Sequence, residues 1–103
     1  MKAKIGIAPI AWSNDDLPEL GGETSLETCL SEAKIAGFMG IETGGKFPKN
    51  SEELKPILDH HEINLCGGWY SGTLLDNDLE DEKLKVRTQM DLFIDLGAPC
   101  LVY

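Results

Sequence analysis

A repeated unit of short apolar run, helix and glycine stop constrains the fold of this chain more than any other feature. The helical stretches end at Ala36-Gly37-Phe38 and Leu96-Gly97-Ala98, and each glycine leads directly into the next apolar run. Glycine accommodates the left-handed residue that ends many helices. A helix between two strands forces the strands to be parallel, with a right-handed crossover. The sequence therefore predicts a parallel α/β fold.

Four short apolar runs are the expected strands. The first contains Ile5 and Ile7 and is bounded by Pro9, and the others span residues 38–43, 63–70 and 100–103. Runs of this length and apolarity are typical of strands buried on both faces.

Three helices are expected between these strands. Thr24 with Glu27, and Asn50 with Glu53, form capping signatures at the start of the first two helices. Apolar side chains then recur at helical spacing: Leu26, Cys29, Leu30 and Ala33 in the first helix, Leu54, Ile57, Leu58 and His61 in the second, and Val86, Met90, Phe93 and Ile94 in the third. Pro56 predicts a kink or irregular first turns in the second helix.

The first loop decides between an open nucleotide-binding sheet and a closed barrel. A dinucleotide-binding sheet requires Gly-x-Gly-x-x-Gly after its first strand, whereas residues 11–16 read Ala-Trp-Ser-Asn-Asp-Asp. The prediction is one partial domain over residues 1–103, the N-terminal part of a parallel (β/α) TIM barrel with four strands and three helices. Because the run stops on a strand, we expect this chain alone to lack a complete active site.

Charge and hydropathy exclude some classes of partner. Nine Lys and Arg against 18 Asp and Glu leave a net charge of −9, which repels phosphate backbones and anionic membranes. No apolar stretch approaches the roughly 18 residues of a membrane span, and the N-terminus lacks a signal-peptide pattern. We therefore expect a cytoplasmic protein without nucleic-acid or membrane partners.

The widely spaced Cys29, Cys66 and Cys100 are predicted to be reduced and buried.

Candidate site residues gather where the strands end, which is where barrel enzymes build their active sites. They are Trp12 and Asn14 after the first strand, Glu42 and Lys46 after the second, and Trp69 and Tyr70 at the third. Aromatic faces pack against the apolar face of a ring, while Asn, Glu and Lys hydrogen-bond hydroxyls, so this mixture suits a polyol. The alternatives are that the aromatic residues cap the core and that Glu42 and Lys46 form a surface ion pair.

Two other clusters have simpler interpretations. The acidic group Asp15, Asp16 and Glu19 has the composition of an ordinary turn. His60 and His61 are neighbours on a helix and point about 100° apart, so they cannot ligate one metal together. No metal ligand is assigned to this chain.

Three loop motifs follow one another in the sequence: Ile-Gly-Ile-Ala-Pro-Ile-Ala-Trp-Ser-Asn-Asp-Asp-Leu-Pro-Glu-Leu-Gly-Gly-Glu-Thr at 5–24, Gly-Gly-Lys-Phe-Pro at 44–48 and Gly-Trp-Tyr-Ser-Gly at 68–72. Together they resemble inosose dehydratase, of the xylose-isomerase-like barrel superfamily. The resemblance covers the whole chain. The family usually reads Gly-Asn-Lys-Phe-Pro, so any polar role of that Asn is lost at Gly45.

The resemblance implies a lyase of inositol catabolism that dehydrates 2-keto-myo-inositol with a divalent metal, manganese or cobalt. The metal polarises the ketone, a base removes the neighbouring proton and an acid helps the hydroxyl leave. The family's metal ligands come from later strands, so no metal is expected on this chain alone. By resemblance, Lys46 steadies an enolate oxygen and Glu42 binds a hydroxyl or transfers a proton. Trp12, Asn14, Trp69 and Tyr70 line the substrate side.

Two other functions remain open. The loops do not separate a dehydratase from a sugar isomerase or epimerase of the same superfamily. A non-catalytic half-barrel module that acts by assembly is also consistent with the sequence, because the first and fourth strands have unpaired edges that invite self-association.

Overall fold

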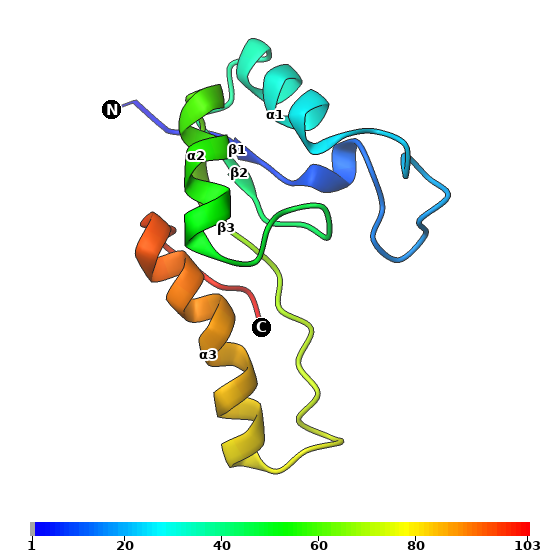
Figure 1. Cartoon of the computed structure of the whole chain (residues 1–103), viewed down its shortest axis with the longest axis vertical. Helices are drawn as coiled ribbons and strands as arrows, with labels where there is room; N and C mark the ends of the chain where they lie inside the picture. The colour runs from blue at the N-terminus through cyan, green and yellow to red at the C-terminus, as the bar shows by residue number, and fades with distance from the viewer. Residues whose placement is uncertain (1) are drawn as a thin grey trace.

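The computed structural model describes residues 2–103 and confirms a parallel α/β fold with three α-helices (Figure 1). The elements follow in the order β1 (Gly6–Ile7), the 3-10 helix η1 (Pro9–Ala11), α1 (Leu26–Ile35), β2 (Gly40–Glu42), α2 (Ser51–His61), β3 (Asn64–Gly67) and α3 (Leu79–Leu96). Within the described residues, no helix is both long and apolar enough to cross a membrane.

The sheet has three parallel strands in the order β1-β2-β3. Ile41 of β2 pairs with Ile7 on one side and with Leu65 on the other. The register then shifts, so that Glu42 pairs with Gly67. This irregularity lies at the carboxyl end of the central strand, where Glu42 enters the candidate site.

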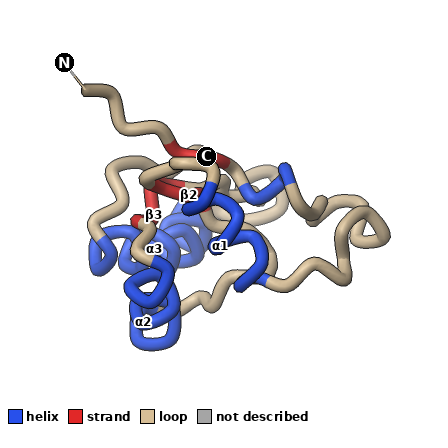
Figure 2. Tube along the Cα trace, turned by 90° about the horizontal axis from the view of Figure 1, so that it is seen from above, coloured by secondary structure: helices blue, strands red, loops and turns tan. Residues whose placement is uncertain are grey.

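All three α-helices cover the same face of the sheet (Figure 2). Ile41 and Leu65 are buried there in one core with residues of each helix: Leu30 and Ala33 of α1, Leu54 and Leu58 of α2, and Leu92 and Phe93 of α3. The opposite face carries Gly6, Gly40 and Cys66, and a Cβ on Gly6 would lie only 2.7 Å from the Cys66 Sγ. This second face is not covered by any helix in the described part of the chain.

The predicted fourth strand is not confirmed. Residues 100–103 form a single parallel bridge between Trp69 and Val102, in which Val102 N donates to Gly68 O at 2.9 Å and Tyr70 N donates to Val102 O at 2.7 Å. The physical reason is the backbone of Gly67, whose φ of 149° ends β3 before the pairing begins. A strand with regular pairing therefore gives way to one isolated bridge.

Helix starts agree with the predictions at one helix and differ at another. Asn50 caps α2 by accepting from Glu53 N at 2.9 Å, as predicted. The cap of α1 is Ser25, which accepts from Thr28 N at 3.1 Å, so the predicted cap at Thr24 is wrong by one residue. α2 runs unbroken through Pro56.

The buried face of α3 differs from the predicted one. Phe93 is buried, but Met90 and Ile94 are 46% and 72% exposed. The neighbours Leu92 and Phe93 both face the core. Successive helical residues point about 100° apart, so Ile94 lies about 200° round the helix from Leu92 and points away from the core. The ring of Phe93 packs at Gly68.

The three cysteines have different environments, and each is a free thiol. Cys29 is buried and Cys66 half-buried, but Cys100 is exposed because it lies in the uncovered segment before the bridge, so its predicted burial is wrong. Burial raises the pKa of the Cys29 thiol, and burial together with the nearby Glu42 carboxylate raises the pKa of Cys66.

Candidate functional site

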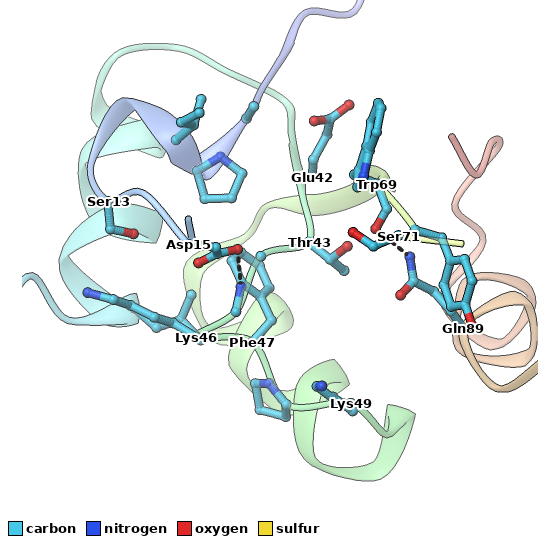
Figure 3. Close-up of a pocket in the computed structure, with 18 of the residues that line it drawn as sticks. Ser13, Asp15, Glu42, Thr43, Lys46, Phe47, Lys49, Trp69, Ser71 and Gln89 are labelled. Atoms are coloured by element: carbon cyan, nitrogen blue, oxygen red, sulfur yellow. Dashed lines mark hydrogen bonds between the residues drawn. The ribbon is translucent and has the colours of Figure 1, made fainter. Parts of the chain in front are cut away.

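A cavity of about 660 Å³ opens where the three strands end (Figure 3). Segments that follow each strand line it, and α3 closes one side with Lys85, Thr88, Gln89 and Leu92. Five of the six predicted site residues line this cavity: Asn14, Glu42, Lys46, Trp69 and Tyr70. The topology therefore brings together residues that are more than 50 positions apart in sequence.

Trp12 is the predicted site residue that does not line the cavity. Its indole Nε1 donates to Glu32 Oε2 at 2.6 Å, and its half-buried ring packs against the core beside α1. In this position Trp12 joins the first loop to α1, and its contact with a substrate remains a prediction.

Asn14 organises the first loop. Its Oδ1 accepts from Asp16 N at 2.9 Å and from Leu17 N at 3.1 Å. The acidic segment that follows Asn14 thus forms a turn, as its composition predicted, but the side chain that holds the turn is Asn14. Asp15 also lines the cavity, and its Oδ2 accepts from Gly45 N at 2.8 Å, so the carboxylate ties the first loop to the second.

The ammonium of Lys46 is bound by backbone carbonyls. It donates to Gly21 O at 2.9 Å, to Gly22 O at 3.2 Å and also to Thr24 O. The ion pairs within residues 2–103 are Lys55–Asp59 and Lys83–Glu80, so the alternative of a Glu42–Lys46 ion pair is wrong. Three carbonyls that converge on one cation hold the loop from Gly21 to Thr24 beside the cavity.

Glu42 has a different environment at the end of the central strand. Its side chain is half-buried in the cavity wall, close to Trp69 and Thr43 in Figure 3. Within residues 2–103 the carboxylate has neither a hydrogen-bond donor nor an ion-pair partner. Of the predicted polar site residues, Glu42 is therefore the one whose charged group is available to a ligand.

The position next to Glu42 depends on a glycine. A Cβ at Gly68 would lie 2.0 Å from Thr43 Oγ1 and 3.0 Å from the Phe93 ring. The close approach of Thr43 to the third strand end thus requires a residue without a side chain. This clash explains the glycine of the Gly-Trp-Tyr-Ser-Gly motif, whose ring-bearing residues follow immediately at Trp69 and Tyr70.

Sequence reasoning missed a buried carboxylate beside the site. Glu82 of α3 is 3% exposed, and it accepts from Thr73 N at 2.9 Å, from Thr73 Oγ1 at 3.1 Å and from the Tyr103 hydroxyl at 2.9 Å. The hydrogen bond from Thr73 N, followed by the one from the Tyr103 hydroxyl, holds the pKa of Glu82 below its usual value. The hydrogen bond to Glu82 also raises the pKa of Tyr103. In the sequence Glu82 sits in an acidic run that is typical of solvated surface, so no local signal distinguishes it.

The acidic, histidine and cysteine side chains of the described residues do not gather into a metal site. Within residues 2–103, no group of three or more His, Cys, Asp or Glu side chains could hold a metal ion. His60 and His61 have nearly perpendicular rings, at 84°, and His61 Nδ1 lies 3.4 Å from Ser31 Oγ of α1. The side chains described therefore do not fit a metal site of their own.

A parallel sheet with helices on one face and a cavity at the carboxyl ends of its strands is the arrangement of β/α-barrel enzymes, and this structure is consistent with a section of such a barrel. No protein-family model matches the chain. Individual curated proteins do match it along its length.

The chain is 48% identical over 103 residues to "Rhizopine catabolism protein MocC" of Rhizobium meliloti, a match that covers 100% of the chain and 32% of that protein. It is 40% identical over 101 residues to "Inosose dehydratase" of Geobacillus thermodenitrificans, covering 98% of the chain and 34% of the relative. For "Inosose dehydratase 2" of Bacillus cereus the identity is 42% over 99 residues, covering 96% and 33%. These matches confirm the resemblance to inosose dehydratase, and the chain spans about a third of the length of these relatives.

Proposed function

We propose that this chain is the N-terminal part of an inosose dehydratase, a lyase that removes water from 2-keto-myo-inositol in inositol catabolism, and that it supplies one wall of the substrate site. The observation that carries the proposal is the unpaired Glu42 carboxylate in a cavity lined by all three motifs of the resemblance. The names of the relatives support the same chemistry. The resemblance implies manganese or cobalt in the intact enzyme. Since the described side chains do not form a metal site, each role below belongs to this chain's own residues.

Glu42 is the proposed proton-transfer residue. A ketone acidifies the C–H bond next to it, and a carboxylate within hydrogen-bond reach of that carbon's proton acts as a general base. Glu42 shares the cavity wall with Thr43 and Trp69. A carboxylate without a protein partner also has its lone pairs free for a substrate.

The third strand end is the proposed ring-binding wall. Trp69 is 66% exposed, and its carbonyl accepts from Gln89 Nε2 at 3.1 Å, which holds the backbone at this point against α3. The apolar face of a cyclitol packs on aromatic rings, while the hydroxyls of Thr43 and Ser71 offer hydrogen bonds to its rim. This wall suits a ring with hydroxyls at its edge.

The proposed role of Lys46 is to stabilise the loop beside the cavity rather than to take part in the reaction. A contact between its ammonium and an enolate oxygen requires it to exchange one of three carbonyl partners for the substrate. The geometry instead favours Lys46 as the residue that keeps the Gly21 to Thr24 loop beside the cavity, while Asn14 shapes the preceding turn.

The test is the turnover of 2-keto-myo-inositol by the full-length enzyme, followed by the ultraviolet absorbance of the dione product. Loss of a general base lowers kcat by about 10²- to 10⁴-fold, so we expect a decrease of this size for Glu42→Gln. Glu53→Gln, on the exposed first turn of α2, is the matched control. Unchanged kcat in Glu42→Gln contradicts the role of Glu42, and a rearranged sugar in place of the dione supports the isomerase alternative.

A further inference from the structure

Glu82 connects three segments that meet at one side of the cavity. It projects from the first turns of α3, accepts two hydrogen bonds from Thr73 in the preceding loop, and accepts a third from the hydroxyl of Tyr103. A buried carboxylate with three donors is a rigid anchor, because the loss of any one hydrogen bond leaves part of a desolvated charge unpaired.

Tyr103 carries this anchor to the cavity wall. Its ring stacks on the ring of Tyr70, with centroids 6.0 Å apart and planes at 17°. The Tyr103 ring also lies against Gly72, where a Cβ would come within 2.4 Å of Cζ. The hydroxyl is bound by Glu82 and the ring contacts both Tyr70 and Gly72, so the position of Tyr103 is defined at both ends.

We infer that Glu82 is a positioning residue, which fixes the ring of Tyr70 at the cavity wall through Tyr103. The inference rests on the proposed function for the nature of the ligand, a cyclic polyol, but not for the geometry. Neither Glu82 nor Tyr103 lines the cavity, whereas Tyr70 does. Glu82 thus acts on the site through another residue.

The neighbouring aromatic residue has a separate support, which makes the effect of Glu82 selective. Trp69 is held by Gln89 and by the bridge to Val102, and neither contact involves Glu82. The loop that follows Tyr70 is bound internally by Asn77, whose amide donates to Thr73 O at 3.0 Å and to Thr73 Oγ1 at 2.6 Å. The bridge to Val102 also holds the backbone of Tyr70, whose N–H donates to Val102 O at 2.7 Å. Loss of the Glu82 anchor therefore releases the rings of Tyr103 and Tyr70, while Trp69 keeps its place.

The rings are observed directly by nuclear magnetic resonance, because Tyr70 and Tyr103 are the two tyrosines of the chain. With ¹³C-labelled tyrosine we expect the inter-ring nuclear Overhauser effect to be lost in Glu82→Ala. We expect it to be retained in Glu82→Gln, whose amide oxygen accepts from Thr73 N and Tyr103 while its NH₂ donates to Thr73 Oγ1. Glu80→Ala, exposed on the same helical turn, is the control. An unchanged inter-ring signal in Glu82→Ala overturns the inference.

A second variant covers the case in which Glu82→Ala does not fold. Tyr103→Phe removes one hydroxyl and keeps the ring, and we expect the Tyr70 ring signals to move to the positions of a mobile tyrosine. Unchanged Tyr70 signals in Tyr103→Phe also overturn the inference.

Ligand binding separates the inference from the proposed function. With myo-inositol as the probe, displacement of an aromatic ring from the wall removes its packing contact with the ligand. We expect a loss of affinity of about tenfold for Glu82→Ala, with recovery in Glu82→Gln. An unaltered affinity in Glu82→Ala overturns the inference. If the wild-type protein does not bind myo-inositol, the proposed polyol function is contradicted. The tyrosine ring signals then test the positioning role of Glu82 by themselves.

Discussion

Lys46 shows that a cation beside a cavity can serve the backbone instead of a ligand. Three carbonyls of the Gly21 to Thr24 segment converge on its ammonium. Gly21 O also accepts from Thr24 N at 3.0 Å. Hydrogen bonds to a charged donor are stronger than neutral ones. The side chain therefore stabilises the loop that follows the Asn14 turn.

Replacement of Lys46 by methionine keeps the aliphatic stem and removes the donors. Hydrogen bonds to charged groups contribute about 1.5–3 kcal/mol, and the partial exposure of Lys46 reduces this value, so we expect the free energy of unfolding to fall by about 1–2 kcal/mol. Urea denaturation measures the loss. Lys49→Met, at an exposed cavity residue, is the control with an expected change within about 0.5 kcal/mol. Equal stabilities of the two variants would show that the three carbonyl contacts contribute nothing.

Two glutamates show how environment separates residues of one type. Glu42 has no donor among residues 2–103, whereas Glu82 has three and a lowered pKa. A group with a lowered pKa in the folded state stabilises the fold above its ordinary pKa of about 4.3, and this contribution is lost as the pH falls further. Glu82 is thus a structural carboxylate, and Glu42 is available for chemistry.

At the scale of the elements, the helices formed where the periodic apolar residues and end signals predicted them. Asn50 caps α2, and glycine with positive φ follows α1 and α3. These signals are local, because a cap satisfies backbone groups within three residues of itself. The buried face of α3 depends on a contact distant in sequence, because the ring of Phe93 packs at Gly68 while Ile94 is exposed.

The start of α1 offers a test between two neighbouring hydroxyl residues. The Ser25 side chain accepts the cap bond from Thr28 N, whereas Thr24 makes backbone hydrogen bonds, with Lys46 and with Gly21 O. Loss of an N-cap costs about 1 kcal/mol, so we expect this decrease in unfolding free energy for Ser25→Ala. For Thr24→Ala we expect a change within about 0.5 kcal/mol. Thermal or urea denaturation of both variants distinguishes them, and the opposite order of stability would restore Thr24 as the cap.

For the molecule as a whole, the uncovered face and edges of the sheet are the dominant feature. Ile5 at the β1 end is 60% exposed, and Val102 and Tyr103 at the other edge are 39% and 58% exposed. Exposed strand edges with apolar side chains invite pairing with another chain. In a closed barrel both edges of the sheet would be paired. The unpaired backbone groups of these edges would therefore find partners either in the remainder of a longer enzyme or in a second chain.

We expect this chain in isolation to self-associate as its concentration rises, which light scattering measures as an increase in mass. A lysine on a strand edge opposes such pairing, so Val102→Lys is expected to shift the protein towards the monomer. Leu75→Lys, in a fully exposed loop away from the sheet, is the matched control and is expected to leave association unchanged. A clean monomer at high concentration contradicts this expectation.

The sequence by itself determined the parallel topology, the three helices and the loops that carry the candidate site, because these depend on caps, glycine stops and the length of apolar runs. Only the tertiary structure decided which side chains of those loops remain free. Lys46 donates to three carbonyls and Trp12 donates to Glu32, whereas Glu42 has no hydrogen-bond or ion-pair partner within the described chain. The reduction of the fourth strand to one bridge was also decided there, by the backbone of Gly67. These outcomes depend on contacts between residues far apart in sequence, whose distances no local pattern encodes.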